Sequence, residues 1–421
     1  MIDIDREIED IDRCNRCGFC QTACPVFRST GHESGVARGR LSLLRAIREK
    51  RLTWSKELED PLFDCLLCGA CTANCFPAIP TADLIVKSRE TYLQRVERKP
   101  IHHLLFDTLL PYPNRLRWAA RSVAAGKKTG LSDVAQALGL LRLFGQEAVF
   151  TDSVLARLTE PPFRDTVPPG EYAGSGADLH IGFFVGCGGD ILNQTASKAT
   201  FQILKKIGRR VTVLDSSCCG LPAYVYGDLT AARKMAKRNF DVLERSAFDV
   251  IVADCASCAS FIKRYPRLFS DNPEQRARAD RIAGQTRDFV EMAAAAMAGD
   301  GNGEDMLATY HDPCHASRGQ NIAEEPRDIL TALPGIRYVE MPEADWCCGG
   351  AGAYALSHQR LSRQVLDRKI ENFKSTGADL LVTACPSCII HLTVGMRRHG
   401  LDGKVCHISE LIARHPPSGG L

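Results

Sequence analysis

The stretch that decides the fold of the first hundred residues is CNRCGFCQTACP at residues 14–25, and it recurs as CLLCGACTANCFP at residues 65–77. In each run, three cysteines are separated by two residues each, and a fourth follows after three more. This spacing lets one tight loop present three thiols to a metal group, while the fourth thiol arrives on the outgoing segment. Because the run occurs twice, the sequence predicts two metal groups held side by side.

The spacing of both runs is that of bacterial ferredoxins, which bind cubane [4Fe–4S] clusters. In two-cluster ferredoxins the fourth cysteine of each run binds the neighbouring cluster. Structural zinc is the alternative, but zinc sites draw their ligand pairs from well-separated segments. We therefore predict two cubane clusters, one held by quartet one (Cys14, Cys17, Cys20 and Cys75) and one held by quartet two (Cys65, Cys68, Cys71 and Cys24).

A second repeat occupies the rest of the chain. A lone cysteine, a Cys–Cys–Gly triplet and a C-x2-C pair follow one another twice, with intervals that agree within two residues. Such agreement indicates a duplicated module. The first five-cysteine set is Cys187, Cys218, Cys219, Cys255 and Cys258, and the second is Cys314, Cys347, Cys348, Cys385 and Cys388.

Each set is embedded in alternating short apolar strands and helices, a pattern typical of α/β units with a largely parallel sheet. We predict strands at 180–185, 211–214, 250–253, 307–310, 338–341 and 380–383, and helices at 195–207, 229–245 and 357–374. Most of the cysteines follow strand ends, where ligands collect in such sheets. A helix beginning at Cys258 or Cys388 would favour the thiolate through its positive end.

The predicted fold class is α+β, with a mainly helical two-cluster domain followed by two tandem α/β cysteine-rich modules. We expect amphipathic helices at 37–51 and from Thr81, with Thr81 as the N-cap. Pro111 and Pro113 should interrupt the helical connector. The expected division is 1–100 for the two-cluster domain, 101–178 for connector and linker, 179–300 and 301–415 for the modules, and 416–421 for the tail.

Composition narrows the class of protein. A net charge of +3 over 421 residues gives no support for nucleic-acid binding. The acidic start MIDIDREIED lacks the pattern of a signal peptide, so the nineteen cysteines point to metal rather than to disulfides. The most apolar stretch, 380–394, is too short to span a bilayer. We expect a cytoplasmic protein, with peripheral attachment to the inner face of the cytoplasmic membrane left open.

The five-cysteine pattern resembles the duplicated cysteine-rich domain of heterodisulfide reductase catalytic subunits. That resemblance implies that each set binds a non-cubane [4Fe–4S] cluster, giving one or two further clusters. The whole chain is similar to the glycolate oxidase iron–sulfur subunit family, in which the same domain follows a two-cluster ferredoxin domain. This similarity runs from the first cysteine run through GVARGR at 35–40 to CCGGAGAYALSHQRLSRQVLDRKIENFKSTGADLLVTACPSC at 347–388.

The resemblance implies an electron-transfer subunit of a flavin-dependent 2-hydroxy-acid dehydrogenase acting on glycolate or D-lactate. Residues 350–355 match a dinucleotide fingerprint formally, but they lack the preceding strand and the acidic partner. FAD is therefore expected on a partner subunit, with a quinone or another carrier as acceptor and no catalytic residue on this chain. The alternative is a heterodisulfide-reductase-like subunit that reduces a disulfide at a non-cubane cluster.

Four further residues have predicted roles around the second set. His311, Asp312 and His315 flank Cys314, where they could tune or protonate a species bound at the metal group, but they are expected to be hydrogen-bond partners around it. Cys406 is expected to be a buried, inert cysteine.

Overall fold

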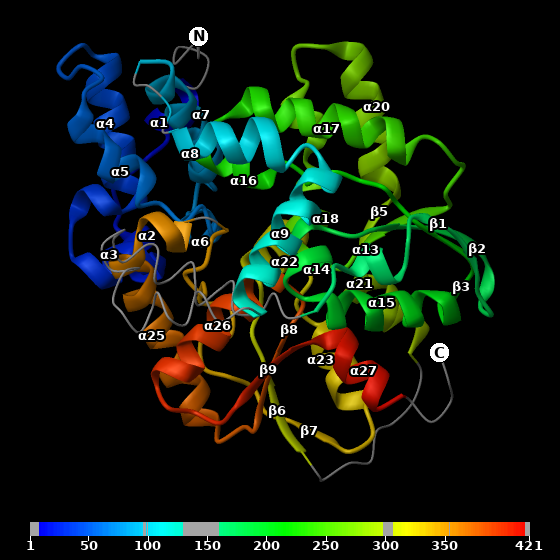
Figure 1. Cartoon of the computed structure of the whole chain (residues 1–421). Helices are drawn as coiled ribbons and strands as arrows, with labels where there is room; N and C mark the ends of the chain where they lie inside the picture. Colours follow the sequence, from blue (N-terminus) through cyan, green and yellow to red (C-terminus); the bar gives the residue numbers. More distant parts are fainter. Residues whose placement is uncertain are drawn as a thin grey trace.

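The computed structural model describes residues 8–95, 98, 100–128, 160–297, 306–352 and 354–416. Residues 298–305 between the two modules and the tail from 417 onward lie outside the described residues, as does the connector between 129 and 159. The α+β fold class is confirmed. A helical N-terminal part is followed by two α/β modules, each built on its own small sheet (Figure 1). The division into domains stays a prediction.

Short helices make up the N-terminal part, because each cysteine run must turn tightly. They are α1 (Ile8–Asp12), α2 (Phe19–Ala23), α3 (Pro25–Thr30), η2 (Glu33–Gly35), α4 (Ala37–Arg48), η3 (Lys56–Leu58), α5 (Glu59–Phe63), α6 (Ala70–Ala73) and α7 (Thr81–Leu93). Leu41, Leu44 and Ile47 form the predicted buried face of α4. Thr81 was wrongly expected to be the N-cap of α7. Pro80 holds that position, and Thr81 is the first helical residue.

The connector is helical and interrupted where prolines were expected to break it. It consists of α8 (Pro100–His103), the π-helical turn η4 (Leu104–Leu109) and α9 (Pro113–Lys128). Pro111 lies in the gap between η4 and α9, and Pro113 opens α9, where a missing N–H costs nothing. The chain is described again from 160 and forms α13 (Phe163–Thr166).

The first module contains five strands in the order β1-β3-β2-β4-β5. They are β1 (Gly170–Ala173), β2 (Ala177–Phe184), β3 (Gly208–Val213), β4 (Val250–Ala253) and β5 (Thr286–Asp288). All neighbours are parallel except β1, which pairs antiparallel with β3. The three predicted strands are confirmed. β1 and β5 were not predicted, and β1 lies within the stretch that the sequence marked as a linker.

The second module repeats this arrangement with four parallel strands in the order β7-β6-β8-β9. They are β6 (Met306–Tyr310), β7 (Ile336–Tyr338), β8 (Leu380–Thr383) and β9 (Lys404–His407). The strand predicted at 338–341 was placed too late, since β7 ends at Tyr338. Beyond this end the Val339 N–H still donates to the Ala308 carbonyl, and the carboxylate of Glu340 accepts from the guanidinium of Arg327.

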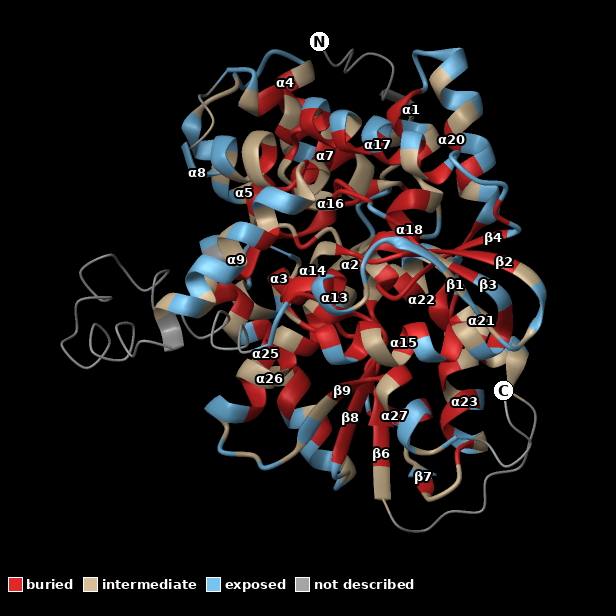
Figure 2. Cartoon of the chain, turned by 45° about the vertical axis from the view of Figure 1, so that its right-hand side comes forward, coloured by how far each residue is buried: buried red, intermediate tan, exposed pale blue. Residues whose placement is uncertain are grey.

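Helices cover the sheets and give both modules one continuous apolar core. In the first module they are α14 (Cys187–Ile191), α15 (Gln194–Ile207), α16 (Leu221–Tyr226), α17 (Leu229–Leu243), α18 (Ala256–Lys263), α19 (Tyr265–Leu268), α20 (Pro273–Gln285) and α21 (Phe289–Ala296). In the second they are α22 (Cys314–Gln320), α23 (Glu325–Ala332), α24 (Tyr354–Ser357), α25 (Gln359–Thr376), α26 (Pro386–Arg398) and α27 (Ile408–Arg414). The central strands are buried along most of their length (Figure 2).

The N-terminal part packs against the second module. Cys24, Val26 and Leu66 share a buried apolar cluster with Trp346 and Val365, and α3 lies beside α25 (Figure 1). This packing brings the second cysteine run to the edge of the second module. This packing therefore determines that the second cysteine run lies next to the second five-cysteine set.

Candidate metal centres

Quartet one surrounds a cavity of about 250 Å³. All four of its predicted members line that cavity, as does Cys71 of quartet two. Cys75 therefore lies near Cys14, Cys17 and Cys20, and the division into two quartets stays a prediction. Arg16 and Gly18 adopt left-handed backbone conformations, with φ of 56° and 92°, which wrap the loop around the cavity. The thiol of Cys17 is exposed, and the aromatic rings of Phe19 and Phe76 are exposed beside it.

Quartet two is more deeply enclosed. Cys24 is buried and lies within electrostatic range of the thiols of Cys65 and Cys68, and Cys71 lies within range of all three. Burial raises the pKa of the Cys24 thiol to about 11 and the pKa of the Cys71 thiol well above its usual value. Leu67 and Gly69 repeat the left-handed turn of the first run, with φ of 54° and 75°.

A buried cation accompanies quartet two. Arg40 is 2% exposed, and its guanidinium donates a hydrogen bond to the carbonyl of Pro61. Its charge acts on the thiols of Cys65, Cys24 and Cys71. Because a buried cation is stable only beside compensating negative charge, Arg40 indicates that anionic groups belong at this site.

The first five-cysteine set gathers at the carboxyl ends of β2, β3 and β4. The Sγ atoms of Cys187 and Cys218 lie 3.8 Å apart. Cys219 is within hydrogen-bonding reach of Cys218 and Cys258, and Cys258 is within reach of Cys255. The five thiols therefore form one continuous group.

The second set gathers in the same way around β6 and β8. The Sγ atoms of Cys348 and Cys388 lie 3.4 Å apart. Cys314 and Cys348 are both within reach of Cys347, and Cys385 is within reach of Cys388. Every member predicted for this set is present in it.

The helices that follow the two sets start earlier than expected. Cys255 is the N-cap of α18 and Cys385 is the N-cap of α26, whereas the sequence placed the helix starts at Cys258 and Cys388. Both cysteines of each C-x2-C pair therefore lie in the first turn, because the strand ends only two residues before the N-cap. The positive end of the helix faces both thiols of the pair.

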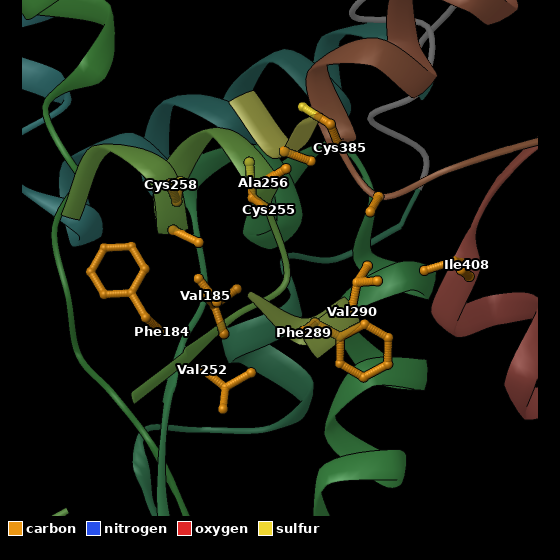
Figure 3. Packing of buried hydrophobic residues seen from close by; sticks show 14 of the residues in the cluster. Phe184, Val185, Val252, Cys255, Ala256, Cys258, Phe289, Val290, Cys385 and Ile408 are labelled. Carbon is orange, nitrogen blue, oxygen red and sulfur yellow. The ribbon is translucent and has the colours of Figure 1, made fainter. Parts of the chain in front are cut away.

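The thiol groups also touch one another across the molecule. Cys68 of quartet two is within hydrogen-bonding reach of Cys347, and Arg318 of α22 donates to the carbonyl of Cys68. Cys255 is within reach of Cys385 in the other module, and the Ala256 N–H donates to the Ala384 carbonyl at 3.1 Å. Figure 3 shows Cys255 and Cys385 at adjoining helix starts. Quartet two and both five-cysteine sets thus form one row.

The residues that flank Cys314 have three different surroundings. Asp312 accepts hydrogen bonds from the guanidinium of Arg327. The Nδ1 atom of His315 lies 3.0 Å from the hydroxyl of Ser257, which in turn lies 3.4 Å from the Sγ atom of Cys385. His311 is fully buried beside Cys348 and Cys388, and burial lowers its pKa to about 3.

Sequence reasoning missed the buried polar residues that hold the Cys–Cys segments. Asn239 of α17 accepts from the Ser217 N–H and donates to the Cys218 carbonyl. Lys369 of α25 donates to the carbonyls of Glu343 and Ala344. A comparison of the two modules at the interval of the cysteine repeat would have paired these two residues, because each lies in the long helix after the Cys–Cys–Gly turn.

The donor chemistry fits iron–sulfur clusters. All nineteen cysteines are free thiols, and the groups described above contain four or five of them each. Thiolates are the ligands that hold such clusters, whereas hard cations prefer oxygen. Cys406 lies apart in β9, where it is buried among apolar residues.

Comparisons with known proteins agree with this geometry. The model of the 4Fe-4S dicluster domain matches residues 10–79, and the model of the cysteine-rich domain matches 181–263 and 308–393. A third model, the linker region of the glycolate oxidase iron-sulfur subunit, matches 97–151. The probable glycolate oxidase iron-sulfur subunit of Bacillus subtilis (strain 168) is 29% identical over 95% of this chain and 92% of its own length. The chain belongs to the glycolate oxidase iron–sulfur subunit family.

Two further matches cover part of this chain or concern the fold alone. Lactate utilization protein A 2 of Bacillus mycoides (strain KBAB4) is 30% identical over 56% of this chain and 98% of its own length. The crystal structure of a hypothetical protein from Helicobacter pylori superimposes with a TM-score of 0.53 at 9% identity, covering 98% of this chain and 74% of that one. This last likeness concerns the fold alone.

Membership of the glycolate oxidase iron–sulfur subunit family makes the chain an iron–sulfur protein with a dicluster domain and two cysteine-rich domains. A search of the described helices finds none with the length and apolar character needed to cross a membrane.

Proposed function

We propose that the chain is the iron–sulfur electron-transfer subunit of a flavin-dependent 2-hydroxy-acid dehydrogenase complex, with glycolate or D-lactate as the substrate. The names of two relatives support this assignment, since one is a probable glycolate oxidase subunit and the other a lactate utilization protein. In this proposal FAD is bound by a partner subunit, and a quinone or another carrier accepts the electrons. The complex works in the cytoplasm or on the inner face of the cytoplasmic membrane.

The observation that carries the proposal is the row of thiol groups that touch one another. In our assignment quartets one and two hold cubane [4Fe–4S] clusters, and the two five-cysteine sets hold one or two non-cubane clusters. Iron–sulfur clusters, when bound, accept and release single electrons at potentials set by their surroundings. Contact between Cys68 and Cys347, and between Cys255 and Cys385, is what a relay of neighbouring redox sites needs.

Quartet one extends this row, because Cys71 of quartet two lines the same cavity, and the extended row has an accessible end and a buried end. Quartet one has an exposed thiol at Cys17 and exposed rings at Phe19 and Phe76. In the five-cysteine sets, by contrast, most thiols are buried, including Cys218, Cys219 and Cys385. We assign the exposed end to docking of the flavoprotein, and the sets to the terminal step, where enclosure keeps water away from the reacting groups.

The test mixes the anaerobically purified chain with the flavoprotein that co-purifies with it and adds D-lactate or glycolate. We expect the visible absorbance of this chain to bleach only when flavoprotein and substrate are both present. The chain alone should oxidise neither acid. Robust oxidation by the chain without a flavoprotein would overturn the proposal.

A second function deserves a test because both five-cysteine sets are complete and touch through Cys255 and Cys385. This arrangement would also suit reduction of a small disulfide between the two modules, as in heterodisulfide reductases. The pre-reduced chain is offered a panel of disulfides, and thiol release is measured together with paramagnetic resonance. Thiol release with a new cluster-linked signal would favour this alternative, and no release across the panel would exclude it.

A further inference from the structure

His311 occupies an unusual position at the end of β6. It is fully buried, and neither of its ring nitrogens makes a hydrogen bond of good geometry, although the Ala344 backbone lies close enough to act on the ring. Its ligand atom and the Sγ atoms of Cys348 and Cys388 all lie within 4.8 Å of one another. Its backbone is fixed by the β8 strand, because the His311 N–H donates to the Val382 carbonyl and the Thr383 hydroxyl donates to the His311 carbonyl. The ring is therefore held against the thiols of the second set.

The first module carries no nitrogen donor at the same place. Phe183 pairs with Val252 in the first sheet as Tyr310 pairs with Val382 in the second. The next residue along each strand is Phe184 in the first module and His311 in the second. Both side chains are fully buried at the carboxyl end of the central strand. A phenyl ring needs no partner there, but an imidazole without one is costly.

We propose that His311 gives a ring nitrogen to iron at the second five-cysteine set, which then has five thiolates and one imidazole as its donors. This inference rests on the proposed iron–sulfur function of the set. Imidazole suits iron as a ligand, and ligation would satisfy a nitrogen that the protein leaves without a partner. The two sets would then differ in their ligands, with sulfur alone in the first and mixed nitrogen and sulfur in the second.

A consequence concerns the reduction potential. The identity and charge of the ligands set the potential of an iron–sulfur centre. Removal of the His311 nitrogen should therefore shift the midpoint potential of the second set and leave that of the first set unchanged. The second set is the one beside Cys68.

The experiment uses the full chain labelled with ¹⁵N-histidine and, in parallel, the unlabelled chain. Pulsed paramagnetic resonance of the partly reduced protein should show a strongly coupled nitrogen that changes from ¹⁴N to ¹⁵N with the label. The variant His311→Phe, which installs the first module's residue, should lose that coupling and shift the midpoint potential of one centre. The labelled parent protein keeps the test valid even where the variant folds poorly.

The matched control is His391→Phe. His391 is also fully buried in the second module, but its Nε2 atom lies 3.0 Å from the hydroxyl of Ser362. Its counterpart three residues after the C-x2-C pair of the first module is Phe261. This variant should keep the nitrogen coupling and the midpoint potential of the parent.

The outcomes separate this inference from the proposed function. A chain whose iron content is unchanged by Cys348→Ala holds no cluster at the second set, and the iron assignment of that set fails. A cluster that is lost in Cys348→Ala but shows no histidine coupling overturns the ligation and leaves the function in place. A weak coupling, as expected from a hydrogen bond to sulfur, also overturns the ligation.

Discussion

The two cysteine-rich modules share a backbone and five thiols, but they differ in the side chains around them. Strand register and helix order place the same three positions at each site. The residues there are Phe184, Asn239 and Asp288 in the first module and His311, Lys369 and His407 in the second. The comparison teaches that the duplicated fold fixes where the thiols lie, while the neighbouring residues set the charge and polarity of each site.

The residues that precede or begin the Cys–Cys pair, and the buried side chain that hydrogen-bonds to them, illustrate this difference. In the first module the neutral Asn239 makes four hydrogen bonds, to the N–H and hydroxyl of Ser217, the Cys218 carbonyl and the Tyr265 hydroxyl. In the second, Lys369 donates to two carbonyls at 2.5 and 3.0 Å. Both residues are fully buried. The first module thus holds this segment with a network of neutral groups around Asn239, and the second holds it with the single cation of Lys369.

The largest expected effect on stability comes from replacing these two buried residues. Asn239→Leu leaves several buried groups without partners and should lower the free energy of unfolding by about 3–5 kcal/mol. Lys369→Met should cost about 1–2 kcal/mol, because loss of the two hydrogen bonds is offset by removal of a buried charge. Anaerobic urea unfolding followed by circular dichroism measures both.

The exposed Lys374 of the same helix provides the control, and Lys374→Met should change the free energy of unfolding by less than about 0.5 kcal/mol. Equal losses of the free energy of unfolding in the Asn239 and Lys369 variants would contradict the comparison, because the two residues would then stabilise their modules equally. A larger loss for Lys369→Met would mean that its charge is strongly compensated by the site it faces.

A second difference lies at the helix that follows the last strand of each sheet. Asp288 caps α21 and His407 caps α27, each in a capping box with a glutamate three residues later. Burial raises the pKa of Asp288 to about 7 and lowers the pKa of His407 to about 4. Both caps are thus held in their neutral forms, although they are an acid and a base.

The two caps should give stability opposite dependences on pH. Between about pH 4 and 7 the folded chain keeps a proton on Asp288 that the unfolded chain has released, so the free energy of unfolding falls as pH rises. Between about pH 4 and 6.5 the unfolded chain binds a proton on His407 that the folded chain refuses, so the free energy of unfolding rises with pH. Each slope reaches at most about 1.4 kcal/mol per pH unit.

Asparagine at either cap removes one slope and supplies a neutral capping oxygen, in place of the carboxyl oxygen of Asp288 or the Nδ1 atom of His407. Relative to the parent, Asp288→Asn should therefore become more stable as pH rises from 5 to 7, and His407→Asn less stable. Urea unfolding at three pH values in this range measures both slopes. Identical slopes in the two variants would show that these caps are not the groups that titrate on unfolding.

The repeat of the cysteines in the sequence was enough to predict the thiol groups and most of the strands, because spacing and apolar runs are local signals. The crossing of Cys24 and Cys75 between the two runs stays a prediction, since Cys71 and Cys75 both line the cavity of quartet one. The contact of Cys68 with Cys347 was not predictable, since it depends on how α3 packs on α25. Strands β5 and β9 were missed because their short sequences, TRD and KVCH, lack an apolar run.

The smallest expected effect concerns Cys406, the cysteine of the second module that has no cysteine counterpart in the first. Cys406 pairs with Val382 in the second sheet as Arg287 pairs with Val252 in the first, so its position in the first module carries no cysteine. Burial raises the pKa of its thiol to about 12, and the charged groups that act on this thiol are Glu410 and Arg414 rather than other cysteines. Cys406→Ala should keep the iron content of the parent and lose only about 1 kcal/mol of stability through the small cavity left behind.

The matched variant Cys348→Ala should lose iron, because Cys348 has a counterpart in Cys219 and lies inside the second set. Iron analysis of the two purified variants, with urea unfolding of each, makes the comparison direct. Loss of iron in Cys406→Ala would mean that recurrence between modules does not separate metal-binding thiols from packing thiols. Retention of iron there, together with its loss in Cys348→Ala, would establish recurrence as the criterion for reading ligands from a duplicated sequence.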